Sequence, residues 1–254
     1  MTAASPPTQA APLPALARRR YPGVRSFAER DQAQFRGRKL ATEELLLRVL
    51  SVRLLLQFAP SGVGKTSLLT AGLFPRLRPR DYFPFIVRLN ETRESLVDAV
   101  RRSLADAAHE CGLVDPVIPP RAETLWALLS GTQLWSQDLL LLTPVLVFDQ
   151  FEEVFSLRDA AFRAEFGRQV GEFAGSSARG EAPPPAKFII SLREEYLGKL
   201  EEFSTSIPEL FRERLRLSPM SADEARRAIT SRPRCQATIG PRRNSATPTA
   251  RWPC

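Results

Sequence analysis

Residues 59–67 read Ala-Pro-Ser-Gly-Val-Gly-Lys-Thr-Ser and have the composition of a loop that binds phosphate groups. Two glycines allow positive φ angles, so that consecutive backbone N–H groups can point at one anion. A helix that starts directly after the loop adds partial positive charge. Lys65 has the reach to contact β- and γ-phosphates, and Thr66 can offer its hydroxyl to Mg²⁺. The residues expected to contact a nucleotide here are Pro60, Ser61, Gly62, Val63, Gly64, Lys65, Thr66 and Ser67.

The loop departs from the usual pattern G-x-x-x-x-G-K-[ST] at its first position, where this chain has Ala59. Alanine is the smallest alternative, but it restricts the turns that glycine allows. A chance Gly-Lys-Thr in a surface loop is the alternative explanation. The flanks favour phosphate binding, because an apolar run precedes the loop and a helical pattern follows it, as in a strand–loop–helix unit.

Acidic residues follow a second apolar run, residues 144–148. A buried parallel strand would deliver Asp149 to the edge of the sheet where ligands bind, so Thr66 and Asp149 are the expected metal-binding pair. Glu152 and Glu153 follow shortly after, and either one could orient or deprotonate an attacking water. The alternative for the two glutamates is a solvated helix start, a position that acidic residues favour.

Arg193 ends a third apolar run, residues 187–192. A guanidinium at that position faces the same edge of the sheet and could contact a γ-phosphate. The alternative is an ion pair with Glu194, Glu195 or a nearby helix. The catalytic residues expected from the sequence are therefore Glu152, Glu153 and Arg193.

The elements that must position these residues alternate along the chain. Apolar runs predict strands at residues 53–58, 82–89, 144–148, 187–192 and 211–217. Helical spacing predicts helices at residues 40–51, from the phosphate loop to about 73, and at 91–110, 123–129, 160–173, 194–203 and 221–229. Residues 28–34 are expected to form a short helical turn, and 112–121 and 175–185 to form loops. The alternation predicts an α/β fold with a doubly wound, mostly parallel five-stranded sheet and flanking helices.

Three residues are expected to mark helix ends. Asn90 and Ser221 are predicted to cap the helices that follow them, because their side chains can accept a hydrogen bond from an unpaired N–H group of the first turn. Pro75 is predicted to end the helix after the phosphate loop.

The basic charge lies at the two ends of the chain. The protein has 254 residues, 43% of them hydrophobic, and a net charge of +8. Residues 1–28 carry four arginines and residues 232–254 carry five, with no acidic residue in either stretch, so the body carries 8 − 9 = −1. Binding of nucleic acid is therefore not expected. Residues 1–20 and 232–254 are expected to be disordered tails, with a transit peptide as the alternative for the first.

The sequence predicts a soluble cytoplasmic protein without a membrane partner. Its longest apolar run, residues 139–148, is interrupted by Thr143 and Pro144 and is too short to span a bilayer. The N-terminal residues lack the apolar stretch of a signal peptide. The three cysteines have no metal-ligand spacing, and their scatter is typical of a reducing compartment.

These motifs together resemble the STAND class of AAA-related P-loop NTPases, in particular the novel STAND NTPase group of bacterial signalling proteins. The resemblance covers residues 21–230 and implies a P-loop NTPase domain at 21–220 and the start of a helical lid at 221–231. It implies ATP and Mg²⁺ as cofactors. The stretches that carry it are residues 21–27, 35–38, 60–75, 147–153, 189–196 and 215–229. The stretches 21–27 and 35–38 together resemble the first motif of the family, which lies near the adenine. The residues expected near the adenine are therefore Arg36, Gly37 and Arg38.

The resemblance implies a switch whose nucleotide state controls self-association and signalling through effector domains, with slow Mg²⁺-dependent ATP hydrolysis. A DNA-associated AAA-type ATPase is an alternative, which the near-neutral body disfavours. A small-molecule kinase shares the phosphate loop, but the block 149–153 and the strand ending at Arg193 favour the switch. Besides Ala59, the chain departs from the family at Lys39, where an acid is usual.

The C-terminal end also departs from the family. The family continues into further domains, whereas Arg, Pro and Thr dominate residues 232–254. The simplest interpretation is a truncated or frame-altered end, with a natural tail as the alternative. An inactive truncated fragment is thus a third possible function.

Overall fold

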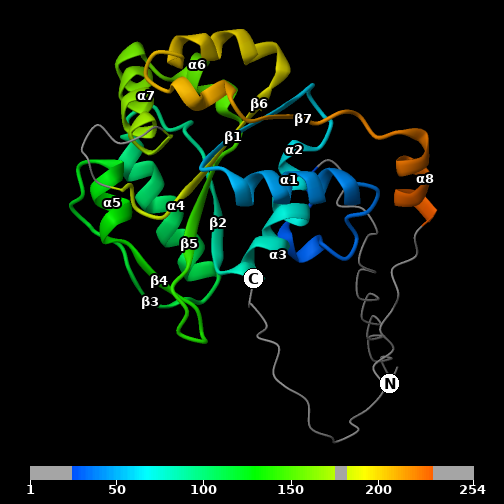
Figure 1. Ribbon diagram of the computed structural model, residues 1–254, viewed down its shortest axis with the longest axis horizontal. Helices are drawn as coiled ribbons and strands as arrows, with labels where there is room; N and C mark the ends of the chain where they lie inside the picture. Colours follow the sequence, from blue (N-terminus) through cyan, green and yellow to red (C-terminus); the bar gives the residue numbers. More distant parts are fainter. Residues whose placement is uncertain (1–24, 175–181, 231–254) are drawn as a thin grey trace, which may run out of the picture.

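The computed structural model describes residues 25–174 and 182–230 (Figure 1). The predicted tails, 1–20 and 232–254, lie outside the described residues, as do residue 231 and most of the predicted loop 175–185. The strands are β1 (Leu54–Ala59), β2 (Tyr82–Val87), β3 (Val114–Val117), β4 (Gln133–Trp135), β5 (Thr143–Phe148), β6 (Lys187–Arg193) and β7 (Arg214–Arg216). The α-helices are α1 (Lys39–Ser51), α2 (Lys65–Ser67), α3 (Phe74–Leu77), α4 (Leu96–Glu110), α5 (Leu125–Gly131), α6 (Val154–Leu157), α7 (Ala160–Ala174) and α8 (Ala222–Thr230).

Tighter or wider helical segments connect several of these elements. The 3₁₀ segments are η1 (Glu29–Asp31), η3 (Arg78–Arg80), η4 (Phe151–Glu153), η5 (Glu194–Phe203) and η6 (Pro208–Phe211), and the π-helical segment is η2 (Leu68–Leu73). The segments α2, η2 and α3 follow one another without a break, so the chain is helical from Lys65 to Leu77.

A five-stranded sheet in the order β2-β5-β6-β1-β7 forms the centre of the domain, and every neighbouring pair in it is parallel. The predicted doubly wound α/β fold is therefore confirmed. Its inner strands are largely apolar because both faces are covered, which leaves no solvent-facing side for polar residues; Gln57 of β1 and Ser191 of β6 are buried exceptions. Parallel strands end at a common edge, so the ends of β1, β2, β5 and β6 lie together.

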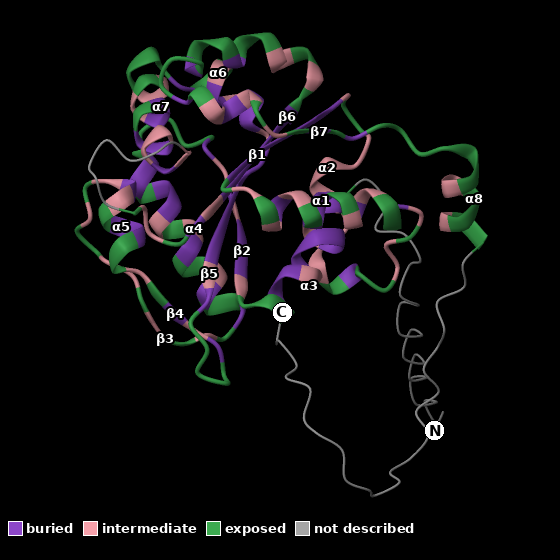
Figure 2. Ribbon diagram, viewed as in Figure 1, coloured by how far each residue is buried: buried purple, intermediate pink, exposed green. Residues whose placement is uncertain are grey.

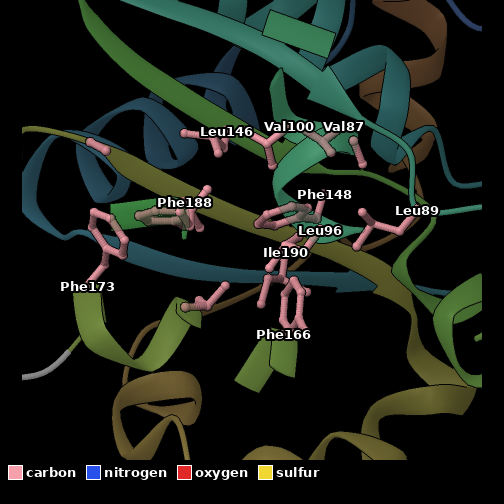
Figure 3. Close-up of a cluster of buried hydrophobic side chains, with 14 of the residues drawn as sticks. Val87, Leu89, Leu96, Val100, Leu146, Phe148, Phe166, Phe173, Phe188 and Ile190 are labelled. Atoms are coloured by element: carbon pink, nitrogen blue, oxygen red, sulfur yellow. The ribbon is translucent and has the colours of Figure 1, made fainter. Parts of the chain in front are cut away.

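Helices cover both faces of the sheet: α1, α2 and α3 lie on one side, and α4, α5 and α7 on the other (Figure 1). The strands between these layers are buried (Figure 2). Side chains alternate along each strand, so each face of the sheet has its own hydrophobic cluster. Figure 3 shows the larger one, in which Phe148 packs against Phe166 with ring centroids 5.1 Å apart, and Phe173 against Phe188 at the same separation.

The smaller cluster joins the phosphate loop to the rest of the domain. Leu68 and Leu69 from η2 pack against Leu55, Ile189 and other side chains on the same face of the sheet. Both η2 residues are fully buried. The helical segment after the loop is thereby fixed on the central strands, which gives the loop a rigid base.

Several helix boundaries differ from those predicted. The helix expected to start after Asn90 begins at Leu96, because the side chain of Ser95 accepts a hydrogen bond from the N–H of Asp98 and caps the first turn. Pro75 does not end its helix: it follows the π-helical turn of η2 and lies in the first turn of α3. A proline is tolerated there because the regular hydrogen-bond ladder is already interrupted. The predicted cap Ser221 is confirmed, since it accepts from the N–H of Glu224.

Two further predictions need correction. Residues 112–121, expected to form a loop, contain β3, which pairs antiparallel with β4. These strands are short and β3 is largely exposed, so they lack the apolar run by which a buried strand is recognised. Cys111 is disulfide-bonded, so the scatter of the cysteines does not support a reducing compartment. Among the described residues, no helix is both long and apolar enough to cross a membrane.

Candidate functional site

The phosphate loop joins the end of β1 to the start of α2. Gly62 and Gly64 have φ angles of 77° and 97°, in the left-handed region that favours glycine. A Cβ atom on either glycine would meet no other atom within 4 Å, so the backbone angle rather than space requires glycine. Ala59 has no positive φ and is the last residue of β1. Alanine is thus compatible with the conformation at the position where the usual pattern has glycine.

Lys65 is half-buried at the base of this loop. Its Nζ donates a hydrogen bond to the carbonyl oxygen of Ala59 at 3.2 Å, across the mouth of the loop. Burial lowers the pKa of Lys65, while the carboxylates of Glu152 and Asp149 act in the opposite direction. A cation held in this way, beside two glycines with left-handed backbone, is the arrangement that a phosphate group requires.

The predicted metal-binding pair is brought together by the fold. The Thr66 hydroxyl donates to Asp149 Oδ2 at 2.9 Å, although the two residues are 83 positions apart. Asp149 is 3% exposed, and its other oxygen, Oδ1, is buried without a hydrogen-bond partner among the described residues.

Mg²⁺ fits this pair. It prefers oxygen ligands and is commonly held by one or two protein groups together with phosphate oxygens. Nowhere in the described ranges do three or more His, Cys, Asp or Glu residues gather in a way that could hold a metal ion by themselves. A hydroxyl and a carboxylate beside a phosphate loop match a site in which one or two protein groups and phosphate oxygens share the Mg²⁺. Asp149 Oδ1, which has no hydrogen-bond partner among the described residues, is available as a ligand atom.

The predicted catalytic residues also lie at this edge of the sheet. Arg193 pairs with Glu152: its Nε lies 2.9 Å from Glu152 Oε1, and its backbone N–H donates to Oε2 at 3.2 Å. Glu152 is buried, whereas the Arg193 side chain is 48% exposed. Glu153 makes no such pair, and its Oε2 is buried without a partner in the part of the chain that is described. The sequence left open whether Arg193 pairs with an acid; it does, and the acid is Glu152.

The predicted adenine-side residues contact the protein itself. Arg38 is 5% exposed and donates to the carbonyl oxygens of Val63, at 3.0 Å, and Ser218, at 2.7 Å. Burial lowers the pKa of Arg38. Gly37 has a φ of 84° and packs against α8, and Arg36 is exposed. All three line a cavity of about 270 Å³ beside η2 and α3. Their contact with a nucleotide stays a prediction.

Ser67 forms a hydrogen bond with Phe27, in the segment that precedes α1. Its Oγ accepts a hydrogen bond from the N–H of Phe27 at 3.1 Å, and the hydroxyl of Thr70 donates to the carbonyl of the same residue. Phe27 stacks edge-on against Phe35, with ring centroids 5.7 Å apart. These contacts fix the segment before α1 on the helix that follows the phosphate loop. Ser67 therefore connects the helix after the phosphate loop to the segment that precedes α1.

Arg88 is a site residue that the sequence analysis missed. Its guanidinium donates to Asp149 Oδ2 at 3.0 Å and also bonds the side-chain amide oxygen of Gln150. Val87 pairs with Phe148 in the sheet, so Arg88 and Asp149 are the next residues along neighbouring strands. The rule that located Asp149, a polar residue directly after a buried strand, did not find Arg88, because the strand was predicted to run to residue 89 and β2 ends at Val87.

The sequence model of the family described as Novel STAND NTPase 1 matches residues 21–239 of this chain. A search among curated proteins found no match. Among solved structures, the Walker-type ATPase paby2304 of Pyrococcus abyssi superimposes with a TM-score of 0.55 at 17% sequence identity, and the alignment covers 79% of this chain and 58% of that one. This likeness supports the α/β fold of a P-loop ATPase.

Two archaeal structures are similar at lower scores. CDC6P from Pyrobaculum aerophilum has a TM-score of 0.48 at 15% identity, covering 74% of this chain and 46% of that one. The ADP form of the ORC2 protein of Aeropyrum pernix has a TM-score of 0.44 at 14% identity, covering 76% and 49%. This chain therefore spans about half to three-fifths of the length of the structures that it matches.

Proposed function

Because the chain belongs to the Novel STAND NTPase 1 family, we propose that it is an ATP-binding module that acts as a nucleotide-dependent signalling switch and hydrolyses ATP slowly with Mg²⁺. The observation that carries this proposal is the 2.9 Å contact between Thr66, at the end of the phosphate loop, and Asp149, at the end of β5. This contact joins the two halves of the proposed nucleotide and Mg²⁺ site.

The phosphates would be bound by the backbone N–H groups of residues 60–66 and by Lys65. Thr66 and Asp149 would hold Mg²⁺, which neutralises phosphate charge when it is bound. Arg193 lies at the end of β6, where its exposed guanidinium can stabilise charge on the γ-phosphate. Glu152 orients Arg193 through two contacts, and Glu153, whose Oε2 has no hydrogen-bond partner among the described residues, is the proposed general base.

Slow hydrolysis is consistent with the ion pair at Glu152. Both of its carboxylate oxygens already accept from Arg193, which makes them weaker acceptors for a proton from water in this state. The ion pair also holds the guanidinium of Arg193 at Glu152, so contact of Arg193 with a phosphate competes with this pair. A catalytic group held in an ion pair favours a switch that changes state slowly over an efficient hydrolase.

Contacts between the phosphate loop and α8 support a switch. Arg38 joins the carbonyl oxygen of Val63, inside the loop, to that of Ser218, in the segment that leads to α8. Gly37, next to it, packs directly against the α8 backbone. A change in the loop on nucleotide binding would therefore be felt at α8 through a single buried side chain. Self-association and effector domains, which the family resemblance implies, are the proposed readout.

Titration calorimetry with ATP, ADP and GTP, each with Mg²⁺ and with EDTA, tests the proposal. We expect ATP and ADP to bind and Mg²⁺ to strengthen binding. Lys65→Met should weaken ATP binding by roughly 1.5–3 kcal/mol, the scale of a hydrogen bond to a charged group. Lys199→Met, an exposed lysine on η5, is the matched control and should bind as the wild type does. Equal ATP affinity in wild type and Lys65→Met would contradict the assignment of the phosphate loop.

A phosphate-release assay on the same samples tests the chemistry. Glu153→Gln should retain ATP binding and lose turnover, because the amide cannot accept a proton. Asp149→Asn should lose the strengthening of nucleotide binding by Mg²⁺ instead. If Glu152→Gln and Glu153→Gln both hydrolyse ATP as the wild type does, neither glutamate is the base.

A further inference from the structure

The guanidinium of Arg88 lies at the one carboxylate that the proposed function assigns to Mg²⁺. Asp149 Oδ2 accepts from the Thr66 hydroxyl at 2.9 Å and from Arg88 Nη2 at 3.0 Å. The Asp149 side chain is 1% exposed, whereas that of Arg88 is 37% exposed. Arg88 is therefore positioned between solvent and a buried carboxylate, on the oxygen that also contacts the hydroxyl of the phosphate loop.

A buried carboxylate needs a positive partner. An ionised carboxylate that is removed from water without compensation is strongly destabilising, and so is the loss of one member of a buried ion pair. Among the described residues, Arg88 is the cation in hydrogen-bonding contact with Asp149. Lys65 is attracted to the same carboxylate, but its hydrogen bond goes to Ala59. Arg88 thus supplies the charge compensation at Asp149 when no metal ion is bound.

We propose that Arg88 is a built-in substitute for the metal ion: it neutralises Asp149 in the nucleotide-free chain and competes with Mg²⁺ for this carboxylate. The inference rests on the proposed function, because it assumes that a metal–nucleotide complex binds at Thr66 and Asp149. Two cations at one carboxylate repel each other, so binding of the metal weakens the contact with Arg88 and the contact with Arg88 weakens metal binding.

The second anchor of Arg88 allows this exchange. The guanidinium also bonds the side-chain oxygen of Gln150, a neutral acceptor next to Asp149. Gln150 has φ 56° and ψ 41°, a left-handed conformation that is uncommon and strained for residues other than glycine. Arg88 holds both residues of this turn, so it can release Asp149 while it remains attached at Gln150.

The surroundings of Arg88 leave its side chain room to move. Arg88 lines a cleft of about 720 Å³ beside β2, between α3 and α4. The cleft is lined by charges of both signs, since Arg78 and Arg102 lie in it together with Asp106. A side chain that is one-third exposed and next to an open cleft can move without disturbing the core.

The test is the affinity of Mn²⁺, a spectroscopic substitute for Mg²⁺, for the protein saturated with ADP. Free and bound Mn²⁺ are measured by electron paramagnetic resonance in wild type, Arg88→Gln, Arg88→Lys and Arg102→Gln. Arg102 is the matched control, because it lines the same cleft but pairs with Glu94 at 2.8 Å. ADP affinity in EDTA, measured first, shows that each variant is folded.

We expect Arg88→Gln to bind Mn²⁺ at least about tenfold more tightly than wild type, because a charged hydrogen bond no longer competes. Arg88→Lys should fall between them, since a lysine cannot bond two acceptors through a planar fork. Arg102→Gln should match the wild type. Equal or weaker Mn²⁺ binding by Arg88→Gln, with ADP binding intact, would overturn the competition. Failure of wild type to bind ADP would overturn the proposed function and this inference with it.

Discussion

The burial of the Lys65 ammonium group lowers the stability of the fold, although this lysine is expected to bind phosphate groups. Burial lowers its pKa from the ordinary lysine value of 10.5, so the folded state holds this proton less strongly than the unfolded state does. Between the two pKa values the unfolded chain binds more protons, and stability rises with pH through that range. The cost is fully present below the folded pKa and is relieved as the pH rises toward 10.5.

This predicts a pH-dependent gap between wild type and Lys65→Met. Urea unfolding at pH 7, 8, 9 and 10 should show Lys65→Met as the more stable protein at neutral pH, with a gap that narrows as the pH rises. Lys187 also has a pKa lowered by burial, but it is present in both proteins and cancels in the comparison. A gap that stays constant across the series would show that the charge of Lys65 is not the source.

Three buried polar residues form a row across the central strands beneath the phosphate loop. Gln57 of β1 pairs in register with Ser191 of β6, and Asp149 follows Phe148, whose partner Ile190 precedes Ser191. Gln57 and Ser191 are 0% exposed, and their side-chain polar atoms have no hydrogen-bond partner among the described residues. Unpaired buried polar groups reduce stability, so this row is maintained at a cost next to the expected metal ligand.

Ser191→Ala should therefore increase the free energy of unfolding by about 1–3 kcal/mol, the scale of an unpaired buried polar group. Urea denaturation measures it, with Ser51→Ala as the control: Ser51 donates to the carbonyl oxygen of Arg48 at the exposed end of α1. If Ser191→Ala is less stable than wild type, its hydroxyl has a partner, and the row is a hydrogen-bonded support for Asp149 rather than a stored cost.

At the scale of elements, α8 is held by residues far away in sequence. A Cβ atom on Gly37 would lie 2.7 Å from the carbonyl oxygen of Glu224 and 3.0 Å from the Cβ of Ala228. The first distance is shorter than van der Waals contact allows, and the φ of 84° is strained for any other residue. No residue of α8 is buried, so surface contacts such as this one contribute to its position.

Gly37→Ala should thus displace α8 and lower the free energy of unfolding by about 1–3 kcal/mol through backbone strain. Hydrogen exchange followed by mass spectrometry should show faster exchange in α8 than in wild type, with α4 and α7 unchanged. Gly198→Ala is the control, because a Cβ there meets no atom within 4 Å. Unchanged exchange in α8 would show that the contact with Gly37 does not hold it.

The central strands could be predicted because a buried parallel strand has a recognisable apolar run. The main helices could be predicted from the helical spacing of their apolar residues. Residues 144–148 and 187–192 differ from β5 and β6 by one residue at one end. The exposed hairpin of β3 and β4 left no such run. Leu40 and Leu47 fitted a helical apolar pattern, yet they are 70% and 68% exposed, since Leu45, Leu46 and Val49 form the buried face of α1. Periodicity located the helix, but only packing decides which face is covered.

The site was predictable in part for the same reason. A strand end followed by a polar residue identified Asp149 and Arg193, and the phosphate loop has a recognisable spacing. The partners could not be predicted, because the Glu152–Arg193 pair and the Arg88–Asp149 pair depend on the order of strands in the sheet. Asp149 and Arg193 lie on neighbouring strands, and Arg88 on the edge strand beside β5. The strand order that brings them together cannot be read from spacing along the chain.

At the scale of the whole molecule, charge and fold are separated along the sequence. Residues 1–28 and 232–254 carry nine positive charges, and the remainder sums to 8 − 9 = −1. The surface of the domain is rich in local ion pairs, such as Arg168 with Glu165 and Glu172, which leave little net field. A DNA-associated ATPase would instead need a positively charged surface on the domain. Its affinity for DNA would also change with the bound nucleotide.

This distribution predicts how the protein behaves toward DNA. We expect weak binding to duplex DNA at low salt that is independent of sequence and unaffected by ATP or ADP. Fluorescence anisotropy at several salt concentrations should give a log–log slope no steeper than about −0.9 for each of the arginines involved. Replacement of Arg18, Arg19 and Arg20 together with Arg232, Arg234, Arg242, Arg243 and Arg251 by serine should remove most of the affinity. DNA binding that survives this replacement and responds to ATP would require a basic surface on the domain and would favour the DNA-associated ATPase over the signalling switch.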